Sequence, residues 1–501
     1  MFSNSNNKIT QIIRILIALA LLVFTGSIQW RLVTKRGDLG LTRVEPLKNA
    51  PPVIAITTVA LGGFRGLIAN ALWIRAVDLQ DQGKYFEMIQ LADWITKLQP
   101  QFKSVWVHQA WNLVYNISIK FNDPEERWRW VLAGIQLLRD EALKYNPVEP
   151  TIYRELAWFF QHKIGFYLDD AHMFYKAKWA KEFSQAVPNG KPNYDSLLNP
   201  KTESDKAQLN LLTKKFKMDP KLMKEVDEKY GPLDWRLPEA HAIYWATLGL
   251  KNSKKEDLIV LRRVIYQSMQ LAFYRGRLIE NPYDQTFQLG PNLQIIDKVN
   301  KAYLEMAEQD PEYGDHIKKV AYKNFLRDAV YFLYCNNRIS AAQHWFDYLC
   351  KTYPKDTLII GDLTSYPDKV NLEQYVIARV EEDLKTTSPD RTKTIIEGLL
   401  TSYYYYLALG ENDTAAGYGL LARKVWNKYN SETSNQKQRL GLPDFPSIQK
   451  DVLDRLLNSP QGFSRELAAQ LRTVLNLPAP SVNTNAIPGQ QPPPTTIQTN
   501  R

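Results

Sequence analysis

Apolar residues recur at spacings of three and four along most of the chain beyond residue 71, as on one face of an α-helix. No stretch keeps the apolar–polar alternation of a half-buried strand. Prolines and clusters of asparagine, aspartate and glycine interrupt the pattern at intervals that suit helical hairpins. The pattern therefore predicts an all-α fold, with two of its long helices at residues 238–248 and 256–279.

One apolar run, residues 12–30, follows a polar N-terminal tail, residues 1–11. Basic residues flank the run on both sides, and Trp30 stands at its end, as at the interfaces of a bilayer. The run is about long enough to span a bilayer as a helix. It predicts a single-pass anchor in the cell membrane and hence contact with lipid. A cleaved signal peptide fits less well, because no small-residue cleavage site follows Thr25.

The flanks of this run give two opposed indications of the side on which the soluble domain lies. Basic residues of the linker, residues 31–50, outnumber Lys8 and Arg14 at the N-terminal end of the run, which favours a cytoplasmic domain. Short basic tails usually stay inside, however, and long domains translocate largely regardless of charge. We adopt the extracytoplasmic side as the expectation.

Residues 53–74 form a second apolar stretch. Gly62 and Gly66 have the spacing that lets membrane helices pack closely, but Arg65 and Asn70 are costly in lipid. We therefore expect a buried first helix of the soluble domain, or two helices that meet at Gly62 and Gly63, in preference to a second membrane span.

The helical pattern also repeats along the chain. Leu72 stands four positions before Ala76, and Trp106 stands four before Ala110 about 34 residues later. The first unit continues with a turn glycine and ends at Pro100. Small residues let two helices approach, and proline ends the second helix. The arrangement resembles the tetratricopeptide repeat family.

That resemblance implies a solenoid of helical hairpins. A third unit opens near Tyr153, and looser units follow at residues 327–354 and 401–429. The predicted organisation places repeats at 51–185, an insertion at 186–237, more repeats at 238–477 and a proline-rich disordered tail at 478–501. The insertion holds a lysine-rich segment, residues 214–229, which we interpret as a solvated amphipathic helix.

Composition narrows the range of partners. Apolar residues make up 45% and charged residues 23% of the 501 residues, the balance of a folded protein. The net charge is +10, but 53 acidic residues are interspersed with 63 basic ones, which argues against a nucleic-acid partner. Two cysteines, Cys335 and Cys350, are too few for a disulfide framework or a zinc site.

No catalytic, cofactor-binding or metal-binding motif is present in the sequence. Two polar stretches remain as candidate sites. The first lies between His162 and His172, with Asp169 and Asp170 near a turn; metal binding or acid–base chemistry is one interpretation, and capping of a helix is the preferred one.

The second stretch lies between Asp234 and His241. Arginine beside tryptophan could bind an anionic or peptide ligand by charge and stacking. A structural junction between the insertion and the repeats is the preferred interpretation, and a binding site is the alternative that we keep as a candidate. The candidate residues are Trp235, Arg236, Glu239 and His241.

The resemblance implies a concave groove that binds a protein or peptide partner. On that basis we expect a membrane-anchored scaffold or assembly factor of an envelope-associated complex, not an enzyme, with no cofactor. A membrane-bound enzyme with its site near His162–His172 or Asp234–His241 is the alternative.

Overall fold

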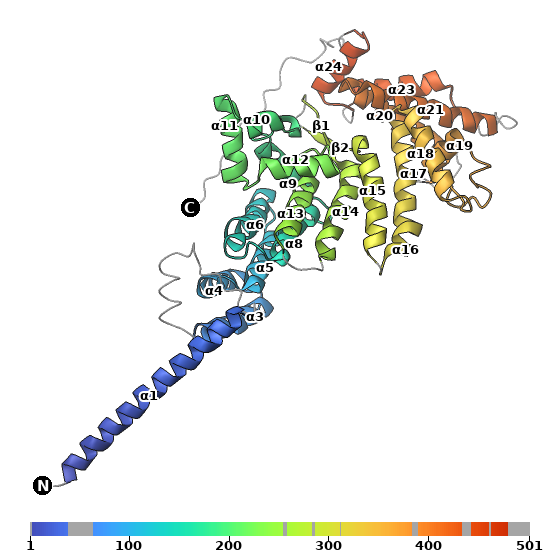
Figure 1. Cartoon of the computed structure of the whole chain (residues 1–501). Helices are drawn as coiled ribbons and strands as arrows, with labels where there is room; N and C mark the ends of the chain where they lie inside the picture. The colour runs from blue at the N-terminus through green and yellow to red at the C-terminus, as the bar shows by residue number, and fades with distance from the viewer. Residues whose placement is uncertain are drawn as a thin grey trace, which may run out of the picture. The chain divides into compact units, whose positions relative to one another are not determined.

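A computed structural model describes residues 3–38, 64–253, 258–282, 286–310, 312–382, 389–432, 442–459 and 462–478. The predicted linker beyond residue 38 and the predicted disordered tail beyond residue 478 lie outside these ranges. The regular structure of the described chain is helical apart from one short β-hairpin, so the all-α expectation is confirmed at this coarse level (Figure 1).

The chain divides into two compact units. The first comprises Met1–Asn122 and Arg129–Ile152, and the second comprises Asp123–Trp128 and Tyr153–Arg501. Helices α6 (Pro124–Gln136) and α8 (Pro150–Trp158) carry the boundaries. The other elements of the first unit are α1 (Ser3–Asp38), α3 (Phe64–Asp81), α4 (Tyr85–Leu98), α5 (Lys103–Trp111), η1 (Asn112–Ile117), η2 (Ser118–Lys120), η3 (Leu137–Ala142) and α7 (Leu143–Tyr145).

Helix α1 contains the whole predicted anchor, residues 12–30. The apolar side chains that the structure describes on this helix are exposed, with Val23 71% and Trp30 76% accessible. Among the residues that the structure describes, no helix meets the length and apolar content needed to cross a membrane. The helical state of residues 12–30 is thus confirmed, and their place in a membrane stays a prediction.

Helices α3 and α4 form the first hairpin, as the first repeat unit predicts. Gly83 makes the turn with a φ of 70°, a conformation that glycine adopts without strain. Ala69 and Ala92 pack with Ile95 between the two helices, so small side chains allow the close approach. The hairpin is confirmed here; membership of the tetratricopeptide family stays a prediction.

The second unit contains further antiparallel helix pairs. Its helices are η4 (Phe159–Ile164), α9 (His172–Phe183), η5 (Pro188–Gly190), α10 (Tyr194–Leu198), α11 (Glu203–Asn210), η6 (Leu211–Lys215), α12 (Pro220–Tyr230), α13 (Pro238–Asn252), α14 (Ile259–Arg275), η7 (Leu293–Ile295), α15 (Ile296–Gln309), α16 (Gly314–His316), η8 (Ile317–Tyr322), α17 (Lys323–Cys335), α18 (Ile339–Thr352), α19 (Leu372–Glu382), α20 (Pro389–Ala408), α21 (Asn412–Glu432), α23 (Phe445–Asn458) and α24 (Arg465–Val474).

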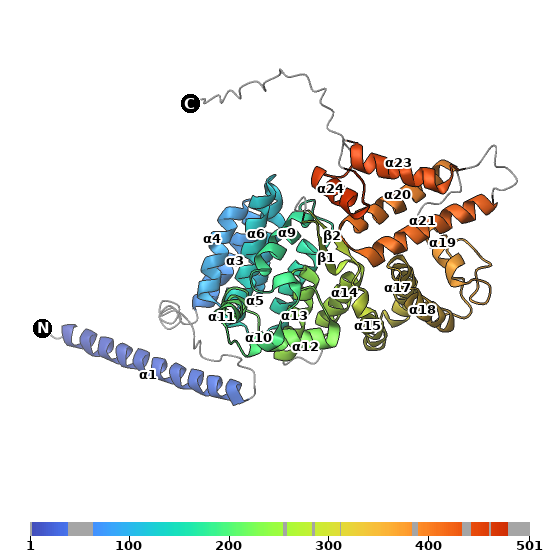
Figure 2. The ribbon, with the colours of Figure 1, turned by 90° about the horizontal axis from the view of Figure 1, so that it is seen from above.

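The two looser repeat units also form helical hairpins. Helices α17 and α18 pack together across a turn in which Asn337 has a φ of 56°. Cys335 ends α17 and is buried, whereas Cys350 lies near the far end of α18; both are free thiols. Helices α20 and α21 lie side by side along their length (Figure 2).

Helix α13 forms the centre of the second unit. Pro238 occupies its first turn, where the missing amide hydrogen costs no helical bond. From Pro238 to Ala246 every residue is buried, including Glu239 and His241. A helix buried on all faces belongs to the core. The two polar side chains must therefore find partners inside the protein.

The prediction of a continuous helix over residues 256–279 is wrong at its C-terminal end. Helix α14 ends at Arg275, and Gly276 is followed by strand β1 (Arg277–Glu280), which pairs antiparallel with β2 (Phe287–Gly290). A side chain at Gly276 would collide with the backbone of Ala272, so the last turn needs glycine. Strands of four residues are too short to show an alternation in the sequence.

The region predicted as an insertion, residues 186–237, contains short helices joined by turns. Helix α11 begins with a capping box formed by Thr202 and Asp205. Helix α12 buries Leu222, Met223 and Val226 and exposes its lysines, which confirms an amphipathic helix in this part of the lysine-rich segment.

Candidate functional site

A polar cleft of about 500 Å³ lies beside the β-hairpin in the second unit; we call it the hairpin cleft. Its walls come from the insertion, the segment before α13, the hairpin and two helix–helix turns. The lining residues are Asn189, Lys191, Pro232, Leu233, Asp234, Arg236, Gly276, Arg277, Leu278, Pro291, Asn292, Leu293, Gln294, Asn336, Arg338 and Glu411. The volume falls in the range of ligand sites in proteins.

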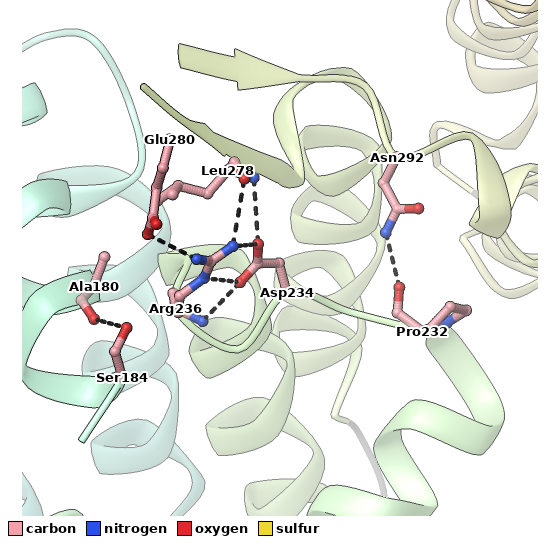
Figure 3. A network of polar contacts seen from close by, with 8 residues as sticks. All are labelled: Ala180, Ser184, Pro232, Asp234, Arg236, Leu278, Glu280 and Asn292. Carbon is pink, nitrogen blue, oxygen red and sulfur yellow. Dashed lines mark hydrogen bonds and ion pairs between the residues drawn. The ribbon is translucent and has the colours of Figure 1, made fainter. Parts of the chain in front are cut away.

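An ion pair between Asp234 and Arg236 forms one wall (Figure 3). Arg236 Nε donates to Asp234 Oδ1 at 2.9 Å, and Nη2 donates to Oδ2 at 2.7 Å. Arg236 Nη1 also donates to Glu280 at 2.8 Å. Burial would lower the pKa of Arg236, but both carboxylates raise it above its ordinary value. Arg236 is therefore a fixed, fully paired cation.

The same ion pair covers the outer edge of β1 (Figure 3). The backbone amide of Leu278 donates to Asp234 Oδ2 at 3.3 Å, and the Leu278 carbonyl accepts from Arg236 Nη2 at 3.3 Å. These are the groups that a third strand would otherwise bind. The side chains of Asp234 and Arg236 thus take the place of a neighbouring strand and protect this edge from pairing with another chain.

Gly190 holds the insertion close to this ion pair. Its φ is 69°, and its carbonyl accepts from the Trp235 amide at 2.9 Å. A Cβ at this position would collide with Asp234 and Arg236. The turn at residues 188–190 therefore needs glycine for its conformation and for the close approach.

The other cations of the lining are Lys191, Arg277 and Arg338, and their pairing differs from that of Arg236. Arg277 pairs with Glu411 at 3.1 Å, and its Nε is buried without a hydrogen-bond partner. Lys191 and Arg338 are exposed, and neither side chain has a partner among the residues that the structure describes. The cleft thus presents two available cations, one from the insertion and one from the α17–α18 turn.

Asn292 joins two lining segments of the cleft by a hydrogen bond. Its Nδ2 donates to the Pro232 carbonyl at 2.8 Å (Figure 3), and its Oδ1 accepts from the Gln294 amide at 3.2 Å. On the neighbouring helix α9, Ser184 Oγ donates to the Ala180 carbonyl at 2.7 Å. The Asn292 side chain forms a hydrogen bond at each of its polar atoms, whereas Asn189 and Gln294 are exposed residues of the lining.

The four residues predicted as a binding site face different surroundings. Arg236 lines the cleft, but Trp235 is fully buried and its Nε1 donates to Asp227 at 2.9 Å. Glu239 accepts from Arg275 Nε at 2.9 Å inside the core. His241 is buried against Phe160, Trp179 and Phe183, and one ring nitrogen lies 2.8 Å from the Trp235 carbonyl. A binding role for these residues stays a prediction.

The stretch between His162 and His172 contains a buried ion-pair network, which we call the Asp169 cluster: Arg127, Lys163, Asp169 and Tyr175. Lys163 Nζ lies 2.6 Å from Asp169 Oδ2, and Arg127 Nη1 lies 3.4 Å from Oδ1. The Ala171 amide donates to the same carboxylate at 2.9 Å, just before α9 begins.

Opposed effects set the ionisation of the Asp169 cluster. Burial would raise the pKa of Asp169, but the bonds from Lys163 and Ala171 and the charge of Arg127 hold it below its ordinary value. Burial lowers the pKa of Lys163, against the pull of Asp169. The side chains of Lys163 and Asp169 are only 3% and 8% exposed. This buried ion pair therefore stabilises the loop before α9.

Lys176 is a second buried base nearby, on α9. Its Nζ donates to the Ile164 carbonyl at 2.8 Å and lies 2.9 Å from His172 Nδ1. Burial lowers the pKa of Lys176 to about 8, while Glu239 raises it and Arg275 lowers it. Among the described residues, no group of histidine, cysteine and carboxylate side chains has an arrangement that could hold a metal ion.

Comparisons of the chain with protein-family models, with curated proteins and with solved structures found no match. The fold and the cleft are therefore the basis of any functional proposal.

Sequence reasoning missed the available cations of the cleft. Lys191 and Arg338 lie far apart in the sequence and belong to no motif. The usable signal was the Pro-Asn-Gly turn at residues 188–190, which marks the point where the insertion approaches Asp234 and Arg236.

Proposed function

We propose that this chain is a membrane-anchored helical scaffold or assembly factor that binds a protein partner through the hairpin cleft. The observation that carries the proposal is the pair of exposed cations, Lys191 and Arg338, in a polar cleft of about 500 Å³. Buried charges need internal partners, and exposed cations in a concave site are available to an external one.

The N-terminal helix is proposed as the anchor. Leu16, Val23 and Phe24 are each at least 60% exposed on α1, and large exposed apolar patches mark contacts with lipid or protein. Basic flanks and Trp30 fit the two interfaces of a bilayer. The soluble domain is proposed to lie on the extracytoplasmic side, as part of an envelope-associated complex.

The experiment is chemical crosslinking of the tagged full-length chain in membranes of its native host, followed by mass spectrometry of the proteins that co-purify. We expect one complex to be recovered in stoichiometric amount together with the chain in the membrane fraction. Recovery of a bound small molecule or metal without any protein partner would overturn the proposal.

A membrane-bound enzyme is the second candidate function, and Lys176 is the observation that favours it. An amine with a pKa of about 8 is partly neutral near physiological pH and can act as a base or nucleophile. Lys176 is fully buried, however, so a substrate could reach it only if the loop before α9 opened. A carbonyl compound trapped on Lys176 by borohydride reduction would support this candidate.

A further inference from the structure

The lining of the hairpin cleft carries an excess of positive charge. Four lining residues are cationic and two are anionic, Asp234 and Glu411. Asp234 neutralises Arg236, which also pairs with Glu280 at 2.8 Å outside the lining, and Glu411 pairs with Arg277 at 3.1 Å. Two positive charges therefore remain without a partner in the described part of the cleft, and a ligand that supplies carboxylates would complete both pairs.

The neutral polar groups of the cleft suit a peptide backbone. Asn189 and Gln294 present carboxamides, each of which can donate to a carbonyl and accept from an amide. Peptide groups offer the complementary donor and acceptor in every residue. A fully ionised inorganic anion would satisfy the cations and accept from the carboxamide N–H groups, but it has no donor for the carboxamide oxygens.

The cations stand on separate segments of the fold. Lys191 follows the turn at residues 188–190 of the insertion, and Arg338 precedes helix α18. Strand β1 contributes Arg277 and Leu278 to the lining, and Gly276 precedes this strand. An extended segment that crosses the cleft could thus meet a cation contributed by each of two turns.

A lipid surface fits this cleft poorly. None of the large apolar side chains that are exposed in the described chain belongs to its lining; the lining residues Leu233 and Leu278 are buried, and Leu293 is half-buried. The positive charge and the exposed carboxamides favour a polar, acidic occupant over one that must insert acyl chains or apolar anchors.

We propose that the hairpin cleft binds an extended acidic peptide segment of the partner protein, with Lys191 and Arg338 each pairing with one of its carboxylates. The ion pair of Asp234 and Arg236 positions the wall and keeps the edge of β1 closed. This proposal rests on the proposed function, because it specifies the part of the partner that enters the cleft.

The test is a titration of the full-length chain in detergent against a fluorescein-labelled decapeptide of alternating Glu and Ala, followed by fluorescence anisotropy. The variant K191E/R338E reverses both cations. The matched control, K355E/R465E, makes the same change of charge at two exposed residues outside the cleft. We expect K191E/R338E to weaken binding by at least about tenfold, because like charges would then face each other, and the control to change it by less than about threefold.

Three results would overturn the inference. The first is no saturable binding of the acidic peptide, and the second is equal weakening by the two double variants. The third is inorganic tripolyphosphate binding as tightly as the acidic peptide and losing as much affinity in K191E/R338E, which would indicate a site for small anions. Recovery of a protein partner from native membranes tests the proposed function separately, since that partner could bind elsewhere on the chain.

Discussion

The Asp169 cluster and the hairpin cleft are both charged regions built on turns, but they treat their charges differently. In the Asp169 cluster, Lys163 and Asp169 are almost completely buried and lie 2.6 Å apart. In the cleft, Lys191 and Arg338 are exposed and have no partner in the described chain. Buried charges are stable only when they are paired within the fold, so the first region braces the structure. In the second region, a charged group of a binding partner can replace the water around the exposed cations.

The ion pair of Asp234 and Arg236 connects these two kinds of region. It is buried and fully hydrogen-bonded, as in the Asp169 cluster, yet it forms a wall of the cleft. Its hydrogen bonds to the backbone of Leu278 close the outer edge of β1. We therefore assign a structural role to the charges that are paired within the fold and a binding role to Lys191 and Arg338.

Removing the carboxylate of Asp169 should have the largest effect on stability. The substitution Asp169→Ala leaves Lys163 buried without its counter-ion, which costs about 3–5 kcal/mol for a buried pair. The control is Asp170→Ala, since Asp170 also contacts Arg127 but is 82% exposed, and an exposed pair contributes only about 0–1 kcal/mol. Chemical denaturation followed by tryptophan fluorescence measures both. Equal losses in the two variants would contradict a bracing role for the cluster.

The substitution Gly190→Ala should destabilise the wall of the cleft. A non-glycine residue at positive φ costs about 1–3 kcal/mol, and the new Cβ would also collide with Asp234 and Arg236. Gly410→Ala is the matched control, because Gly410 has a φ of 76° but open space around it. We expect the loss in free energy of unfolding to be clearly larger for Gly190→Ala. Similar losses would show that the contact with the ion pair contributes nothing.

The buried amine of Lys176 should make stability depend on pH. Its pKa is about 8 in the folded chain, against about 10.4 for an unperturbed lysine. Between these values the unfolded state binds more protons, so the free energy of unfolding rises with pH. From pH 7 to 9.5 the gain should be about 2 kcal/mol, relative to Lys176→Met. Denaturation series for both proteins across this range check it; parallel curves would mean that Lys176 keeps an ordinary pKa.

Reversing the cleft cations should leave stability almost unchanged. Lys191 and Arg338 are exposed and have no partner among the described residues, so the double variant K191E/R338E should unfold within about 0.5 kcal/mol of the wild-type chain. The same denaturation assay measures this. A large loss would show that the two side chains belong to the internal structure, and the contrast between the two regions would disappear.

The helical hairpins were predictable because their signals are local. Gly83 and the small residues Ala76 and Ala92 mark a turn and a close helix pair within one short segment. The β-hairpin was missed because strands of four residues carry too little alternation, and because the apolar residues of β1 continue the pattern of α14. Gly276 was the local sign that the helix ends.

The candidate site was less predictable. Trp235 and Arg236 attracted attention as an aromatic residue beside a cation, but nothing local distinguishes a ligand-binding pair from one held by Asp227 and Asp234. The burial of Trp235 and Arg236 makes this distinction, and their burial follows from the position of α13 in the core. Lys191 and Arg338 could not be linked from sequence at all, because the fold alone brings their two turns to one cleft.

The most direct test of the account compares what the chain captures when the cleft is intact and when its charge is reversed. Full-length wild-type chain, K191E/R338E and the control K355E/R465E are each expressed in the native host and crosslinked in its membranes. The co-purified proteins are then quantified by mass spectrometry. The account predicts that the wild-type chain and the control recover the same partner and that K191E/R338E loses most of it while remaining folded. Equal recovery by all three proteins would contradict the assignment of binding to the hairpin cleft.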